Sequence, residues 1–144
     1  MNMNVIIVRS AGRMRKGGEP LFTDRYGWFA ALSKSFPHPL PLVTVNEDCG
    51  VRKTAIRLLA SSSIEWYDAF LGGGIAGAVN AAGAGLGIAP LPVRLAASTL
   101  AEVGDLLGLP ELPTEEMVLY ARPVDDRTRE TLRILASAFR RTSG

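Results

Sequence analysis

The sequence has very few of the side chains that most often carry catalysis, metal binding or cross-links. Its 144 residues include one cysteine, Cys49, and one histidine, His38. A single cysteine excludes an internal disulfide framework and a cysteine-based metal site. His38 lies in the turn-like segment FPHPLP, and without a second histidine neither a Ser-His triad nor a common zinc site is supported. We therefore expect a protein that is not an enzyme and that uses no metal and no cofactor.

The chain also has no large excess of positive or of negative charge. Sixteen Lys and Arg against fourteen Asp and Glu give a net charge of +2, too small to argue for a nucleic acid or an acidic partner. The N-terminus lacks the apolar core of a signal peptide, because the run VIIV is followed at once by Arg9. With 47% hydrophobic residues, the chain has the composition of one globular domain, and we expect it to be cytoplasmic.

The segment Ala69–Val93 contains no charged residue, seven glycines and two prolines. Three interpretations compete for it: a membrane span, a glycine loop that binds a nucleotide, or a strand-helix-strand unit that lines a ligand cleft. Its length is sufficient for a span of about 20 residues. However, Pro90 and Pro92 would break the last turns of such a helix, so we expect no contact with a membrane.

A nucleotide loop is suggested by Gly72, Gly74 and Gly77, which spell G-x-G-x-x-G between a strand-like and a helix-like run. A dinucleotide fingerprint also needs an acid about 20 residues further on, at the end of the next strand. Here that strand ends in Pro90 and Pro92 instead. A dinucleotide-dependent enzyme that uses the turn at Gly72–Gly77 therefore remains the alternative function.

The strand-helix-strand interpretation accounts for every residue of the segment. Alternation predicts a strand at 64–71, the glycines then turn the chain, and apolar residues at helical spacing follow. A short buried strand at Leu86–Ala89 would complete a β-α-β unit. The predicted strand face consists of Ile64, Trp66, Asp68 and Phe70, and the helix face of Ile75, Ala78, Val79 and Ala82.

Further strands are expected at Val5–Val8, 24–32, Leu40–Val45 and 117–121. The continuous apolar run Val5–Val8 is typical of a parallel strand that is buried on both faces. Because these strands alternate with helical runs, the pattern indicates an α/β fold built on a parallel sheet.

Three helices have recognisable start signals. Asp48 is the predicted N-cap of a helix that buries Val51, Ala55 and Leu59. Pro92 is expected as the first residue of a helix that ends at Gly104. Asp125 or Asp126 would cap a last helix, whose apolar face consists of Leu132, Leu135, Ala136 and Phe139.

Three segments together resemble the effector-binding region of LysR-type transcriptional regulators. The pattern includes a helix with Arg52 one turn in, a small-residue helix that ends at Ala82–Gly85 or at the later Gly85–Gly87, and I-x-x-L-P at Ile88–Pro92. The match runs from Met3 to Arg141. The segments are LPLVTVNEDCGVRKTAIRLL, EWYDAFLGGGIAGAVNAAGAGLGIAPLPVRLA and EMVLYARPVDDRTRETLRILASAFRR.

The resemblance implies a periplasmic-binding-protein-like (type II) α/β fold, represented here mainly by its second subdomain. Residues 1–25 would be a remnant of the first subdomain, and 26–122 would hold two crossing strands and the second subdomain. Residues 123–144 would form a C-terminal helix that returns to the first subdomain. In the family a winged helix-turn-helix precedes this region. None is recognisable here, so we expect a chain truncated at its N-terminal side that contacts DNA only through a domain it lacks.

The implied function is effector sensing, with a small anionic metabolite bound between the subdomains. Open α/β sheets bind ligands beyond the carboxyl ends of their strands. Helix starts at such ends offer free amides and a positive dipole end. Trp28 on a crossing strand could form the floor of the cleft. The expected ligand-binding residues are Asn46, Glu47, Asp48, Cys49, Gly72, Gly73, Gly74 and Trp28.

The missing part of the first subdomain has a physical consequence. Val5–Val8 and the apolar face of the last helix would lose the surface that normally covers them. Burial of a large apolar side chain contributes about 1.5–3 kcal/mol, so uncovered faces favour association. We therefore expect a homo-oligomer.

Overall fold

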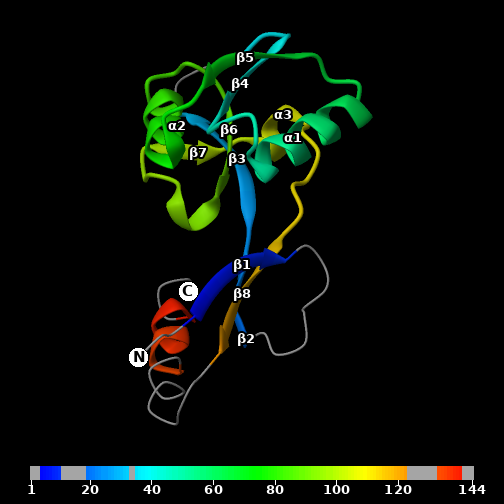
Figure 1. Ribbon diagram of the computed structural model, residues 1–144. Coiled ribbons are helices and arrows are strands. Elements are labelled where there is room, and N and C mark those ends of the chain that lie inside the picture. Colours follow the sequence, from blue (N-terminus) through cyan, green and yellow to red (C-terminus); the bar gives the residue numbers. More distant parts are fainter. Residues whose placement is uncertain (1–3, 11–18, 33–34, 123–132, 141–144) are drawn as a thin grey trace. The chain divides into compact units, whose positions relative to one another are not determined.

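The computed structural model describes residues 4–10, 19–32, 35–122 and 133–140, which form two compact units (Figure 1). Unit 1 comprises Met1–Arg25 and Thr114–Gly144, and unit 2 comprises Tyr26–Pro113. The finer division of the chain into a remnant, a second subdomain and a returning helix stays a prediction.

Unit 1 contains a three-stranded antiparallel sheet in the order β1-β8-β2. The strands are β1 (Asn4–Ser10), β2 (Glu19–Asp24) and β8 (Glu115–Arg122). The apolar run Val5–Val8 lies in β1, so the strand was predicted, but its expected parallel pairing was wrong. Its partner is the late strand β8, which runs in the opposite direction, and an apolar run alone does not encode the direction of its neighbour.

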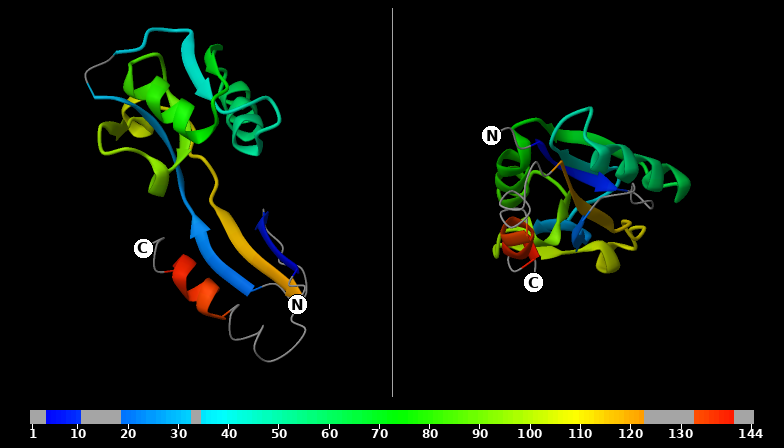
Figure 2. Two further views of the ribbon diagram at one scale, coloured as in Figure 1. Left: turned by 60° about the vertical axis from the view of Figure 1, so that its left-hand side comes forward. Right: turned by 60° about the horizontal axis from the view of Figure 1, so that its bottom comes forward.

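The core of unit 1 joins the sheet to the helical residues 133–140. Leu21 of β2, Leu119 of β8 and Ala136 are buried together, and Phe139 packs against them. Figure 2 shows this helix beside β2 and β8. The predicted caps of this helix, Asp125 and Asp126, lie outside the described residues, as does Leu132.

Unit 2 is built around β4 (Leu40–Thr44), which pairs in parallel with β5 (Trp66–Leu71). Leu42 also forms a parallel bridge with Ile88. The helices α1 (Gly50–Ser61) and α2 (Gly74–Gly83) lie on opposite sides of these strands (Figure 1). Every residue of β4 is buried, as expected for a strand covered on both faces.

Side chains of β4 alternate between the two helices. Leu40 and Leu42 belong to the apolar cluster that contains Ala55 and Leu59 of α1. Val43 belongs to the cluster that contains Ala78, Ala81 and Ala82 of α2. The predicted β-α-β unit is therefore present, with α2 connecting β5 to the segment that bridges β4.

The strand β5 departs from the predicted alternation because it contains a bulge. Leu42 pairs with Asp68, but the next residue, Val43, pairs with Phe70, which leaves Ala69 unpaired. A bulge of this kind turns the following side chain to the other face. Trp66 accordingly packs in the α1 cluster, whereas Phe70 packs in the α2 cluster. The expectation that Trp66, Asp68 and Phe70 share one face was wrong for Phe70.

The helix predicted from Pro92 to Gly104 is absent from this described part of the chain. In its place are β6 (Ala89–Pro92), the short 3-10 helix η1 (Val93–Leu95), β7 (Leu100–Glu102) and α3 (Gly104–Leu107). Both β6 and β7 pair antiparallel with β3 (Tyr26–Ala31), and Pro92 lies opposite Tyr26. The pairing with β3 outweighs the local helical periodicity. The strand predicted at Leu86–Ala89 was placed too early, because β6 begins at Ala89, Ile88 forms only a bridge to Leu42, and Leu86 is exposed.

Within the described residues, no helix combines the length and the hydropathy that a membrane crossing requires. The charge-free segment 69–93 forms the end of β5, all of α2 and β6.

Candidate functional site

The carboxyl ends of β4 and β5 lie side by side. Thr44, the last residue of β4, pairs with Leu71, the last residue of β5. The two segments remain hydrogen-bonded one residue beyond β5, because the Gly72 amide donates to the Thr44 carbonyl oxygen at 3.1 Å. The structure thus brings the turn that follows β4, which holds Asn46, and the glycine turn that follows β5 to one edge of the sheet. We call this edge, formed by Asn46–Gly50 and Gly72–Ala76, the strand-end site.

The glycine turn bends the chain from β5 directly into α2. Gly72, Gly73 and Gly74 all have positive φ values, +133°, +73° and +64°, which glycine adopts without a steric penalty. The first intrahelical bond runs from the Gly77 amide to the Gly73 carbonyl oxygen at 2.9 Å. The amides of residues 74–76 therefore have no partner within the helix.

The start of α1 differs from its prediction. A turn at Asn46–Cys49, closed by a 3.3 Å hydrogen bond from the Cys49 amide to the Asn46 carbonyl oxygen, precedes a helix that begins at Gly50. Cys49 is thus the N-cap, and within the described chain its side chain makes no capping hydrogen bond. The prediction of Asp48 as the N-cap was wrong, because this turn carries Asp48 outside the helix. Its side chain and that of Glu47 are exposed.

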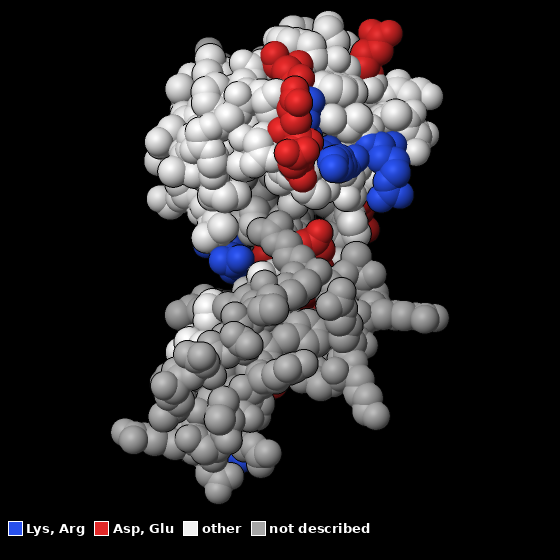
Figure 3. Space-filling view, viewed as in Figure 1, with Lys and Arg blue, Asp and Glu red and all other residues white. Residues whose placement is uncertain are grey.

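The two helix starts differ in charge. Glu47 and Asp48 place negative charge before α1, whereas residues 69–93, which include the start of α2, carry no charged side chain. Figure 3 shows the surface over α2 free of Lys, Arg, Asp and Glu in the described part of that face, while Lys and Arg gather on the side of α1. The positive dipole end of α2 is therefore the one that no acidic side chain of its own segment offsets.

Trp28, the remaining predicted ligand contact, lies elsewhere. Its side chain is 2% exposed and belongs to the core cluster of Leu42 and Leu59. Its indole Nε1 donates to the Pro110 carbonyl oxygen at 2.9 Å. The structure therefore places Trp28 in the interior of unit 2 and not at the strand-end site.

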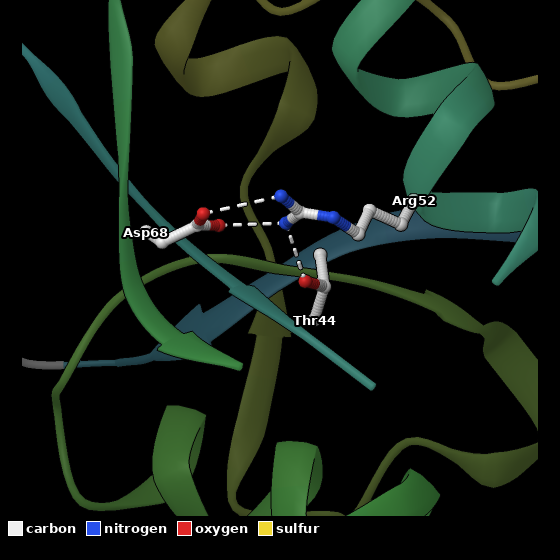
Figure 4. A network of polar contacts seen from close by, with 3 residues as sticks. All are labelled: Thr44, Arg52 and Asp68. Carbon is white, nitrogen blue, oxygen red and sulfur yellow. Dashed lines mark hydrogen bonds and ion pairs between the residues drawn. The ribbon is translucent and has the colours of Figure 1, made fainter. Parts of the chain in front are cut away.

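A polar network of two buried residues, Thr44 and Arg52, with the more exposed Asp68 lies next to the strand-end site and was not predicted (Figure 4). The Arg52 guanidinium of α1 donates through Nη1 and Nη2 to the two carboxylate oxygens of Asp68, at 2.6 and 3.1 Å. Nη1 also donates to Oγ1 of Thr44 at 2.9 Å. The sequence offered two signals for this network: a charged residue, Asp68, on the predicted strand face that is otherwise apolar, and Arg52 one turn into its helix.

Comparison with known proteins gives a consistent result for the fold. No protein-family model matches the chain, and no curated protein matches it. Solved structures do match. The regulatory domain of HypT from Salmonella typhimurium, in its apo form, is 18% identical with a TM-score of 0.70, and the match covers 94% of this chain and 73% of that chain. The regulatory domain of CcmR from Synechocystis PCC6803, in complex with 2-PG, is 15% identical with a TM-score of 0.68, and this match also covers 94% of this chain and 73% of that chain.

The structure of a longer protein, VV2_1132, a LysR family transcriptional regulator, is also similar. It is 12% identical with a TM-score of 0.64, and the match covers 97% of this chain but 48% of that chain. The chain therefore has the fold of the regulatory domains of LysR-type regulators, an α/β fold of the periplasmic-binding-protein-like type II class. This confirms the fold that the sequence resemblance implied.

Proposed function

We propose that this chain is an effector-sensing part of a LysR-type transcriptional regulator, and that unit 2 binds a small anionic metabolite at the strand-end site. The observation that carries the proposal is the meeting of two helix starts without side-chain caps at the adjacent carboxyl ends of β4 and β5. Ligands of open α/β sheets bind beyond such strand ends. In this proposal DNA is contacted through a helix-turn-helix outside the present sequence.

The neighbours in structure support the class of ligand. The CcmR regulatory domain is in complex with 2-PG, and another structure of the HypT regulatory domain is bound to a bromide ion. In unit 2 the free amides of residues 74–76 supply hydrogen-bond donors, and the helix dipole of α2 adds about 0.3–1 kcal/mol for a nearby negative charge. Glu47 and Asp48 repel a second negative group close to α1, which favours ligands with one anionic end.

The structure does not favour the alternative of a dinucleotide-dependent enzyme. The glycines of G-x-G-x-x-G do lie between a strand and a helix. However, the chain after α2 enters β6, Ala89–Pro92, which ends without the carboxylate that would bind a ribose hydroxyl. The neighbours in structure are regulatory domains of transcription regulators.

Calorimetric titration of the purified chain separates the two functions. The ligands are acetate, benzoate, inorganic phosphate, bromide and 2-PG in one series, and NAD, NADP and ATP in the other. We expect saturable binding of at least one small anion and none of the nucleotides. Binding of a dinucleotide alone would overturn the proposal in favour of the alternative.

A substitution at Asn46 tests the location of the site. Asn46→Ala removes an exposed side chain and keeps the carbonyl group that closes the turn. We expect weaker anion binding with an unchanged unfolding temperature. Asn80→Ala is the matched control, because Asn80 is also exposed but lies in the second turn of α2. Equal affinity in both variants and in the wild type would place the ligand elsewhere.

A further inference from the structure

Arg52 occupies an unfavourable position for a cation. Its side chain is 10% exposed, and it lies in the first turn of α1, where the helix dipole already supplies positive potential. Burial of a cation is costly unless it is paired and hydrogen-bonded. A well-packed apolar group in the same volume is often as stabilising as a buried ion pair. Packing alone therefore does not explain why an arginine stands here.

The contacts of Arg52 join three elements of unit 2 (Figure 4). The guanidinium of α1 holds both carboxylate oxygens of Asp68 in β5 and the hydroxyl of Thr44 in β4. It also lies over the ring of Trp66, 5.6 Å from the ring centroid. A planar guanidinium bound at two carboxylate oxygens fixes orientation as well as distance, which a lysine ammonium does not.

These contacts stand on one side of the bulge in β5, and the glycine turn stands on the other. Asp68 is the last residue in register before the bulge, and Phe70 is the first after it. Beyond the bulge the Phe70 ring packs under the glycine turn, 3.5 Å from where a Cβ of Gly73 would lie. Thr44 links the two sides, because its hydroxyl accepts from Arg52 while its carbonyl oxygen accepts from the Gly72 amide.

We propose that Arg52 is a positioning residue for the strand-end site. By holding Asp68 and Thr44, it fixes the bulged register of β5 against β4, and this register sets where the glycine turn lies relative to Asn46. A slip by one residue would displace the turn by about 3.3 Å along the strand and would move side chains to the wrong face. The inference rests on the proposed function for the site itself, and Arg52 touches no ligand in it.

The test compares Arg52→Met and Arg52→Lys with the control Arg57→Met, which removes an exposed cation from the same helix. Amide hydrogen exchange is measured at Gly72, and exchange at buried Leu59 serves as the reference for global opening. NMR titration with inorganic phosphate gives the affinity for the anion. We expect Gly72 exchange in both Arg52 variants to accelerate about tenfold more than Leu59 exchange, the scale of one lost charge-assisted hydrogen bond. Phosphate affinity should fall with it, and Arg57→Met should change neither.

Two milder variants keep the proposal testable if the Arg52 variants do not fold. Thr44→Val keeps the branched shape and removes the hydroxyl that accepts from Arg52, and Asp68→Asn removes the charge of a side chain that is 38% exposed. The proposal predicts selective loss of Gly72 protection in both. It is overturned if Gly72 and Leu59 exchange accelerate equally, or if variants with an unprotected Gly72 amide bind phosphate as the wild type does. Failure of the wild type to bind phosphate would count against phosphate as a ligand of the site, while the exchange data would still decide the role of Arg52.

Discussion

Single glycines in unit 2 have different structural requirements, although the sequence presents them as one small-residue run. A Cβ on Gly87 would lie 2.6 Å from the carbonyl oxygen of Pro41, which accepts the hydrogen bond from Ile88 in the bridge to β4. A Cβ on Gly83, the last residue of α2, would meet nothing within 4 Å. Close backbone contact thus requires glycine at one position, whereas the other position has room for a side chain.

This difference predicts opposite effects of the same substitution. Gly87→Ala should lower the free energy of unfolding by about 1–3 kcal/mol, because two backbone segments must move apart. Gly83→Ala should raise it by about 0.4–1 kcal/mol, because alanine restricts the unfolded chain and favours the helix. Urea denaturation measures both, and changes of the same sign would contradict the packing described for the bridge.

Trp28 gives a second test at this scale, because it was a predicted ligand contact that the structure places in the core. Trp28→Phe removes the hydrogen bond to the Pro110 carbonyl and should lower the free energy of unfolding by about 0.5–1.5 kcal/mol. Anion affinity should remain that of the wild type, as measured by calorimetry. Weaker binding at unchanged stability would instead return Trp28 to the site.

The elements that the sequence predicted well are those whose signals are local. Alternation and the glycine cluster were sufficient for the presence of β5, the turn and α2, whereas the ligand contacts expected there stay a prediction. The false helix after Pro92 and the missed bulge at Ala69 share one cause, since both depend on pairing with distant strands, β3 and β4. The contact of Arg52 with Asp68 was hidden for the same reason, because it forms only once β5 lies beside β4.

At the element scale, a substitution at the start of α2 should change helix stability and anion affinity in opposite directions. Ala76 is exposed in the first turn of α2, where Ala76→Asp should stabilise the helix by about 0.3–1 kcal/mol through the dipole. The same carboxylate should repel a bound anion, so affinity should fall while stability rises. Ala76→Asn is the matched neutral control and should keep most of the affinity. Equal calorimetric affinities for the Asp and Asn variants would show that the anion does not lie at this helix start.

At the scale of the whole molecule, the chain matches 72–73% of the length of the HypT and CcmR regulatory domains and 48% of VV2_1132. We propose that it associates with itself through apolar surface. Large apolar side chains remain exposed in both units, among them Leu106 (84%), Leu32 (75%) and Ile134 (61%). Their burial between copies would supply a favourable free energy of association.

Sedimentation velocity over a range of micromolar concentrations tests this proposal. We expect a mass that is a multiple of the 15.4 kDa chain at the upper end of the range. A single monomeric mass at every concentration would contradict self-association and leave the exposed apolar side chains to a different partner.

The central claim is that the adjacent ends of β4 and β5 bind a small anion, and a map of amide chemical shifts tests it most directly. The labelled chain is titrated with inorganic phosphate, acetate, benzoate and 2-PG, and with NAD for comparison. The account predicts that an anion shifts the amides of Asn46–Gly50 and Gly72–Ala76 in a saturable way, and that NAD does not. Saturable shifts confined to other parts of unit 2, or produced by NAD alone, would contradict it.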